Sequence, residues 1–200
     1  YNRGSTARAI AICGTSEYDM AVLYRESIRD YPCIYTYNKE KDTWEKLSGS
    51  DVTLSYSYSG YPQGIIMGKD DAYLKASPIE SGGKSLYWDG TKWAQDDLKL
   101  TSIVKQNNTT AFAGGKTGGV YKHIYNKDGV SEDGYWQKLD IPGFDDSGWI
   151  TVLSASPDGK LYVTKNGSVV EGRYVYTNGT KNIYEIDTSK ETPTVKTIYD

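Results

Sequence analysis

The sequence predicts an all-β fold made of repeated four-stranded antiparallel units. Two observations support this prediction. No segment of a dozen residues shows the 3.6-residue apolar period of a helix, and one strand–turn–strand pattern recurs along the chain. Each copy is a tyrosine-rich apolar stretch, a short turn rich in Asn, Asp or Gly, and a second strand. The copies occupy residues 33–47, 85–95, 120–139 and 182–199, and the first three place Trp44, Trp93 and Trp136 after the turn.

The spacing of the copies predicts the architecture. They recur at roughly 40 to 60 residues, the range of propeller blades and solenoid turns. Two further short strands precede each copy, so a unit is a meander of four strands. One such sheet alone exposes both faces, and stacking the units around an axis buries them. We therefore predict a small β-propeller in a single domain, with units at approximately 8–48, 49–98, 99–141 and 142–200.

Two stretches leave the blade count open between four and five. Residues 51–58 alternate in polarity, which is typical of an extra strand or of the first strand of the second blade. Residues 168–170 and 173–176 are compatible with an added hairpin. Both stretches are also compatible with decorations of a four-bladed ring.

Composition excludes several classes of function. The net charge is −3 and the basic residues are scattered, so nucleic-acid binding is not expected. No apolar run approaches the roughly 20 residues that span a bilayer. The aromatic residues are 19 Tyr and 5 Trp against 2 Phe. Tyrosine suits half-buried sheet faces and also builds recognition surfaces.

Reactive side chains are few. Cys13 and Cys33 fall on the first and third strands of one unit, which are not neighbours, so we expect two small buried side chains rather than a disulfide. His123, the only histidine, lies within a strand with no nucleophile motif nearby. Facing carboxylates, which glycoside hydrolysis needs, cannot be inferred from the acidic pairs. We therefore expect no catalytic residue, no metal site and no cofactor.

The candidate ligand site lies in the connections between blades. The strand tryptophans recur at equivalent positions, as blade packing requires, so we assign them to the core. Other aromatic residues fall in segments 55–62 and 142–149, amid Ser, Gly, Pro and Asp. Aromatic faces beside carboxylates suit sugar rings. The predicted ligand-binding residues are Tyr58, Tyr61, Asp145, Asp146 and Trp149.

The repeated hairpins resemble the β-propeller repeat proteins of the kelch, tectonin and lectin-like kind, and the receptor-binding propellers of phages. The resemblance covers essentially the whole chain and is loose, since the double glycine of kelch repeats is absent. Residues 156–162 resemble a degraded Asp-box of the sialidase-type propellers.

These observations lead to three functional hypotheses. The leading one is a non-catalytic recognition module for surface glycan in a secreted, cell-surface or virion-attached protein. The second is a structural platform that docks other protein subunits. The third is a glycan-cleaving hydrolase.

Overall fold

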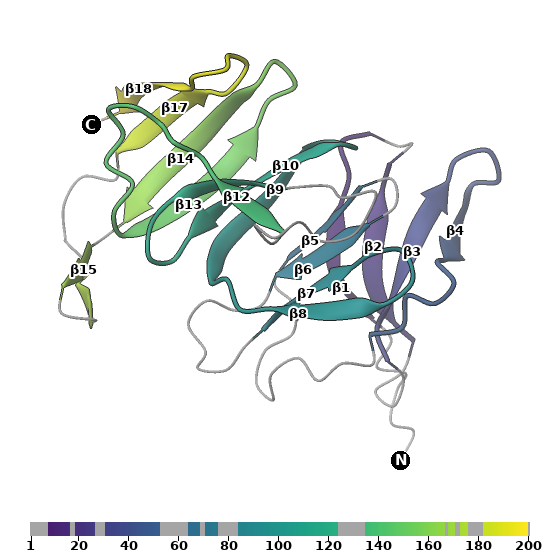
Figure 1. The fold of residues 1–200 in the computed structure, drawn as a ribbon. Helices are drawn as coiled ribbons and strands as arrows, with labels where there is room; N and C mark the ends of the chain where they lie inside the picture. Colours follow the sequence, from purple (N-terminus) through teal and green to yellow (C-terminus); the bar gives the residue numbers. More distant parts are fainter. Residues whose placement is uncertain are drawn as a thin grey trace. The chain divides into compact units, whose positions relative to one another are not determined.

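A computed structural model gives the fold of the chain (Figure 1). It describes residues 8–16, 19–26, 31–52, 64–68, 71–75, 84–123, 135–166, 168–170, 173–175 and 182–199, with residues 8, 166, 168–170 and 173–175 by backbone alone. The chain divides into two compact units, Tyr1–Asp97 and Leu98–Asp200.

The first unit holds two antiparallel sheets, each with its strands in sequence order. The first sheet consists of β1 (Arg8–Cys13), β2 (Ala21–Arg25), β3 (Cys33–Asn38) and β4 (Thr43–Lys46). The second sheet consists of β5 (Gly64–Met67), β6 (Ala72–Lys75), β7 (Ser85–Trp88) and β8 (Trp93–Asp96).

The second unit repeats this arrangement. The third sheet consists of β9 (Leu100–Asn107), β10 (Thr110–Gly115), β11 (Val120–His123) and β12 (Trp136–Lys138). The fourth sheet consists of β13 (Trp149–Ala155), β14 (Lys160–Asn166), β17 (Ile183–Asp187) and β18 (Thr194–Tyr199). A separate hairpin, β15 (Ser168–Val170) and β16 (Arg173–Val175), is inserted between β14 and β17.

The all-β prediction is confirmed. Across the described ranges there are four antiparallel four-stranded sheets, one hairpin and no helix. The repeated hairpins pair as expected, with Trp44, Trp93 and Trp136 opposite Tyr37, Trp88 and His123. The hairpin of residues 168–170 and 173–175 is a separate two-stranded sheet, so it is not a fifth four-stranded blade. Of the other open stretch, residues 53–58 lie outside the described residues, and Asp51 and Val52 lie outside any strand.

Each unit has its own core between two stacked sheet faces. In the first unit the alternate residues Ala21, Leu23 and Ile34 of the first sheet pack against the second sheet. The second-sheet side of that core is Ile65, Met67, Ala72, Leu74, Leu86 and Trp88. In the second unit Phe112 and Val120 of the third sheet pack against Ile150, Val152, Leu161, Val163 and Ile186 of the fourth. Period-2 alternation therefore buries one face of each sheet against its neighbour.

The strand tryptophans divide between core and surface. Trp136 is buried, and Trp93 packs against the core of the first unit. The assignment of Trp44 to the core is wrong: its side chain is 41% exposed. The register places Trp44 on the face of the first sheet opposite to Leu23 and Ile34, and that face does not take part in the core of the unit.

Candidate ligand-binding surface

The predicted acidic residues lie in the connection between β12 and β13, within residues 139–148. This connection follows the outermost strand of the third sheet and leads into the first strand of the fourth. Trp149 was predicted to lie in the connection and is instead the first residue of β13, where it pairs with Asn166 and is half-buried. Tyr58 and Tyr61 lie outside the described residues.

Asp145 fastens the connection to the fourth sheet. Its carboxylate forms an ion pair with Lys165 of β14, and Oδ1 accepts the backbone N–H of Ser147 at 3.1 Å. The Lys165 ammonium, with the help of Ser147, holds the pKa of Asp145 at about 2. The carboxylate is ionised at neutral pH and contacts Lys165 and Ser147, while most of the side chain stays exposed to solvent.

Asp146 fastens the same connection to the third sheet. Its carboxylate lies 2.7 Å from Lys138 Nζ, and its backbone carbonyl accepts the N–H of Gly119 at 3.0 Å. Gly118 and Gly119 both have positive φ, and a Cβ on Gly118 would lie 2.3 Å from the Asp146 carbonyl oxygen. The turn between β10 and β11 therefore meets the β12–β13 connection.

A groove runs between the third and fourth sheets of the second unit, with a volume of about 690 Å³. The register explains its third-sheet wall, because Phe112 pairs with Lys122 and Lys122 pairs with Gln137, which puts the three side chains on one face. This row runs from the buried Phe112 to the exposed Lys122 and Gln137. The rest of the lining is Gln106, Thr110, Lys138, Leu139, Asp140, Pro157, Asp158, Gly159, Thr188, Ser189, Lys190, Glu191 and Pro193.

Hydrogen bonds hold the turns that line the fourth-sheet side. Gln106 Nε2 donates to the Ser156 carbonyl at 2.6 Å, and the N–H of Thr188 donates to the Gly159 carbonyl at 2.8 Å. Gly159 has a φ of +92°, and a Cβ at this position would lie 3.0 Å from Ser189 Cβ, a close contact. The Pro157–Gly159 turn, which lies within the Asp-box-like residues 156–162, is thus fixed against the 188–193 turn, and both turns line the groove.

A second hollow of about 290 Å³ links the groove to the predicted acidic residues. It shares Lys138, Leu139 and Asp140 with the groove, and its further lining is Ile141, Phe144 and Asp146. The structure therefore brings Asp146 beside the groove. The Asp145 side chain turns to Lys165 instead. Sequence reasoning missed the groove because two sheets form it, and only the Asp-box-like segment 156–162 lies in one of its walls.

The chemistry available at this surface is hydrogen bonding. Amide, hydroxyl, ammonium and carboxylate groups line the groove together with the apolar side chains of Phe112 and Leu139. In the part of the chain that the structure describes, no three His, Cys, Asp or Glu side chains gather in a metal-binding cluster. Within the same residues, no helix is long and apolar enough to cross a membrane. His123 is buried with its ring 4.8 Å from that of Trp136, a packing position within the sheet.

The sequence matches no protein-family model and no curated protein. Among solved structures, the chain is similar to YCF48 from Cyanidioschyzon merolae, a β-propeller, with a TM-score of 0.51 and 12% sequence identity. The fold is that of a β-propeller. The similarity covers 98% of this chain and 58% of the YCF48 chain, so this propeller chain spans little more than half the length of the other. At this identity the likeness extends to the fold alone.

Proposed function

We propose that this propeller chain is a non-catalytic recognition module that binds surface glycan, as lectin-like and receptor-binding propellers do, in a secreted, cell-surface or virion-attached protein. The observation that carries the proposal is the groove between the third and fourth sheets. Its volume of about 690 Å³ lies in the range of roughly 300–1,000 Å³ that is usual for ligand sites.

The lining of the groove favours a hydroxylated ligand. The lining includes the basic residues Lys122, Lys138 and Lys190, the acidic residues Asp140, Asp158 and Glu191, and the apolar residues Phe112 and Leu139. A sugar ring presents both hydroxyls and a C–H face, so it complements such a lining. Water competes for every hydroxyl, and each hydrogen bond therefore nets only about 0.5–1.5 kcal/mol.

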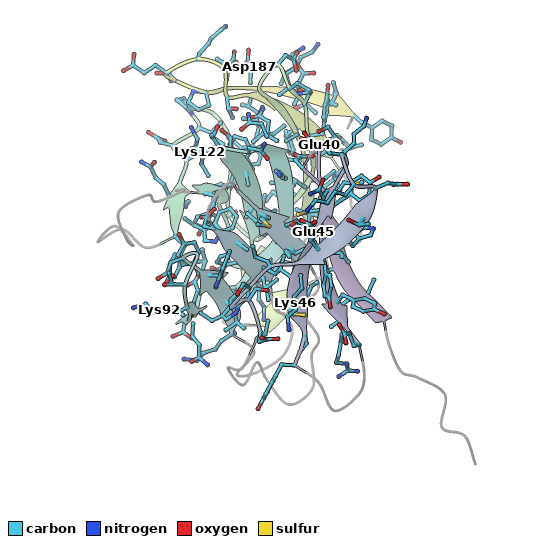
Figure 2. The ribbon with its side chains drawn as sticks, turned by 90° about the vertical axis from the view of Figure 1, so that its right-hand side faces the viewer. Glu40, Glu45, Lys46, Lys92, Lys122 and Asp187 are labelled. Atoms are coloured by element: carbon cyan, nitrogen blue, oxygen red, sulfur yellow. The ribbon has the colours of Figure 1, made fainter. Side chains whose placement is uncertain are left out.

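A glycan array followed by titration of the best ligand tests the proposal. Lys122→Ala and Gln137→Ala should each weaken binding by about 2- to 13-fold, the equivalent of one such hydrogen bond. Both side chains are exposed, so neither variant should lose stability. Lys92→Ala is the matched control, because Lys92 is an exposed lysine in the β7–β8 hairpin of the other unit (Figure 2).

Two results would overturn the proposal. Absence of any glycan ligand on the array would refute the function, and equal affinity of wild type, Lys122→Ala and Gln137→Ala would refute the groove. Recovery of the ligand as cleaved product would favour the hydrolase instead, since a recognition module returns its ligand intact.

The protein-docking platform is the second candidate. It is favoured by the outer strand β18, where Ile198 and Tyr199 are exposed, the latter by 65%. Exposed apolar residues on an outer strand suit contact with another subunit. In that case the chain would bind a protein partner and no glycan, and substitution of Tyr199 would weaken the complex.

A further inference from the structure

Gln106 connects the two walls of the groove. It lies on β9 of the third sheet, and its Nε2 donates at 2.6 Å to the carbonyl of Ser156, which follows β13 of the fourth sheet. Both residues belong to the second unit, so the contact lies within one compact body. The Gln106 side chain also lines the groove. One side chain therefore helps to hold the groove together and forms part of its surface.

The hydrogen bond from Gln106 belongs to a longer series. The Ser156 carbonyl also accepts the N–H of Gly159 at 3.1 Å, which occupies both lone pairs of the oxygen. The Gly159 carbonyl accepts the backbone N–H and the hydroxyl of Thr188, each at 2.8 Å. The series therefore links β9 to the 156–159 turn and that turn to the 188–193 turn, and both turns line the groove.

The contact with Ser156 determines which way the Gln106 amide points. A carbonyl oxygen only accepts hydrogen bonds, so the NH₂ group must face Ser156 and Oε1 must point elsewhere. Among the described residues no donor meets Gln106 Oε1, and the atom is not enclosed by its surroundings. The groove thus has a hydrogen-bond acceptor whose orientation is fixed before a ligand arrives. A fixed group loses little conformational entropy on binding.

Gln137, the other glutamine of the groove, is not anchored in this way. It is exposed on the outer strand β12, and its side chain makes no hydrogen bond within the part of the chain that the structure describes. Its amide can rotate to offer either the oxygen or the NH₂ group, so it accepts a ligand donor and a ligand acceptor equally well. Gln106 alone of the two discriminates between them.

We propose that Gln106 is a specificity-determining residue of the groove: Nε2 holds the 156–159 turn in place, and Oε1 accepts a hydroxyl or amide hydrogen of the bound sugar. The role of Oε1 rests on the proposed function, whereas the role of Nε2 does not. The groove should therefore select a sugar that presents a donor at this point.

Hydrogen exchange of the ligand-free chain tests the role of Nε2. Gln106→Met keeps the length of the side chain and removes the donor. The amide protons of Gly159 and Thr188 should then exchange about 2- to 13-fold faster, the equivalent of one hydrogen bond. Gln137→Met is the matched control, because it makes the same change in the same groove and should leave both rates unchanged. Equal rates in wild type and Gln106→Met would refute this role.

Titration with sugars tests the role of Oε1 in the wild-type chain. The probes are cellotetraose, chitotetraose and maltotetraose, each added into the millimolar range while the side-chain amide signals of both glutamines are recorded by NMR. The two methionine variants assign these signals, since each removes one of them. At least one probe should shift the signals of Gln106 as well as Gln137. Gln106→Met should weaken the binding of that probe by about 2- to 13-fold.

The outcomes separate the role of Gln106 from the proposed function. If a probe shifts the Gln137 signals but leaves those of Gln106 in place, and Gln106→Met binds it as wild type does, the groove binds sugar and the role of Oε1 is refuted. If none of the three probes shifts either glutamine, the role of Oε1 is also refuted, and the glycan array decides the proposed function independently.

Discussion

The tryptophans of this chain differ in how deeply their side chains are buried. Trp136 is 5% exposed and packs against His123 of the neighbouring strand, whereas Trp149 is half-buried at the start of β13. Trp93 is intermediate, and its indole N–H donates to the Ser50 carbonyl at 3.3 Å. Tryptophans that look equivalent in the repeat therefore differ in what they contribute to stability.

Truncation should reveal this difference. Trp136→Ala removes a buried ring and should lower the free energy of unfolding by roughly 3–5 kcal/mol. Trp149→Ala should cost clearly less, because part of its ring already contacts water. Urea unfolding of the two variants measures both changes. A larger loss for Trp149→Ala than for Trp136→Ala would contradict the burial that separates them.

The Asp145–Lys165 ion pair should make stability depend on pH in the acid range. The pKa of Asp145 is about 2 in the folded chain against an ordinary value of 3.8, so the unfolded chain takes up the proton first. The stabilisation is present above about pH 4 and is lost as the pH falls towards 2. The effect should be small, because the Asp145 side chain is 74% exposed and solvent screens it.

Asp145→Asn checks this dependence. Wild type should be more stable than the variant at pH 6 in urea unfolding, and the two curves should converge near pH 2. A difference that persists unchanged at pH 2 would show that the carboxylate charge is not its cause.

At the scale of elements, turns decide how neighbouring sheets meet. The turn between β10 and β11 touches the β12–β13 connection through backbone, at Gly119 and Asp146. Two glycines of the second unit allow a matched comparison. Gly118 has a φ of +108° and no space for a Cβ, whereas Gly143 has a φ of +79° and no atom within 4 Å of the position of a Cβ.

Gly118→Ala should therefore destabilise more than Gly143→Ala. The alanine at position 143 bears only the conformational cost of positive φ, about 1–2 kcal/mol. The alanine at 118 bears a similar cost and also displaces the Asp146 carbonyl, which breaks the contact between turn and connection. Thermal unfolding of both variants measures the difference. Equal losses of stability in Gly118→Ala and Gly143→Ala would mean that the β12–β13 connection shifts to make room for the Cβ at no cost.

At the scale of the whole molecule, the repeat predicted most of the fold. Alternation and turn residues determine where a strand lies and which side chains share a face, so the pairing of Trp88 with Trp93 could be predicted. They do not determine which face a neighbouring sheet covers. For this reason Trp44 was assigned to the core, and the groove between the third and fourth sheets was not foreseen. The lysine partners of Asp145 and Asp146 come from other strands, and no local pattern indicates them.

Cys13 and Cys33 lie on the two strands that flank β2, and their separation determines whether a disulfide can contribute to the first unit. Cys13 pairs opposite Ala21 at one end of β2, and Cys33 lies opposite Tyr24 at the other, so the sheet itself holds both thiols apart. Burial raises the pKa of Cys33, which keeps its thiol protonated at neutral pH. In the described residues, the packing of the first unit therefore does not depend on a disulfide between Cys13 and Cys33.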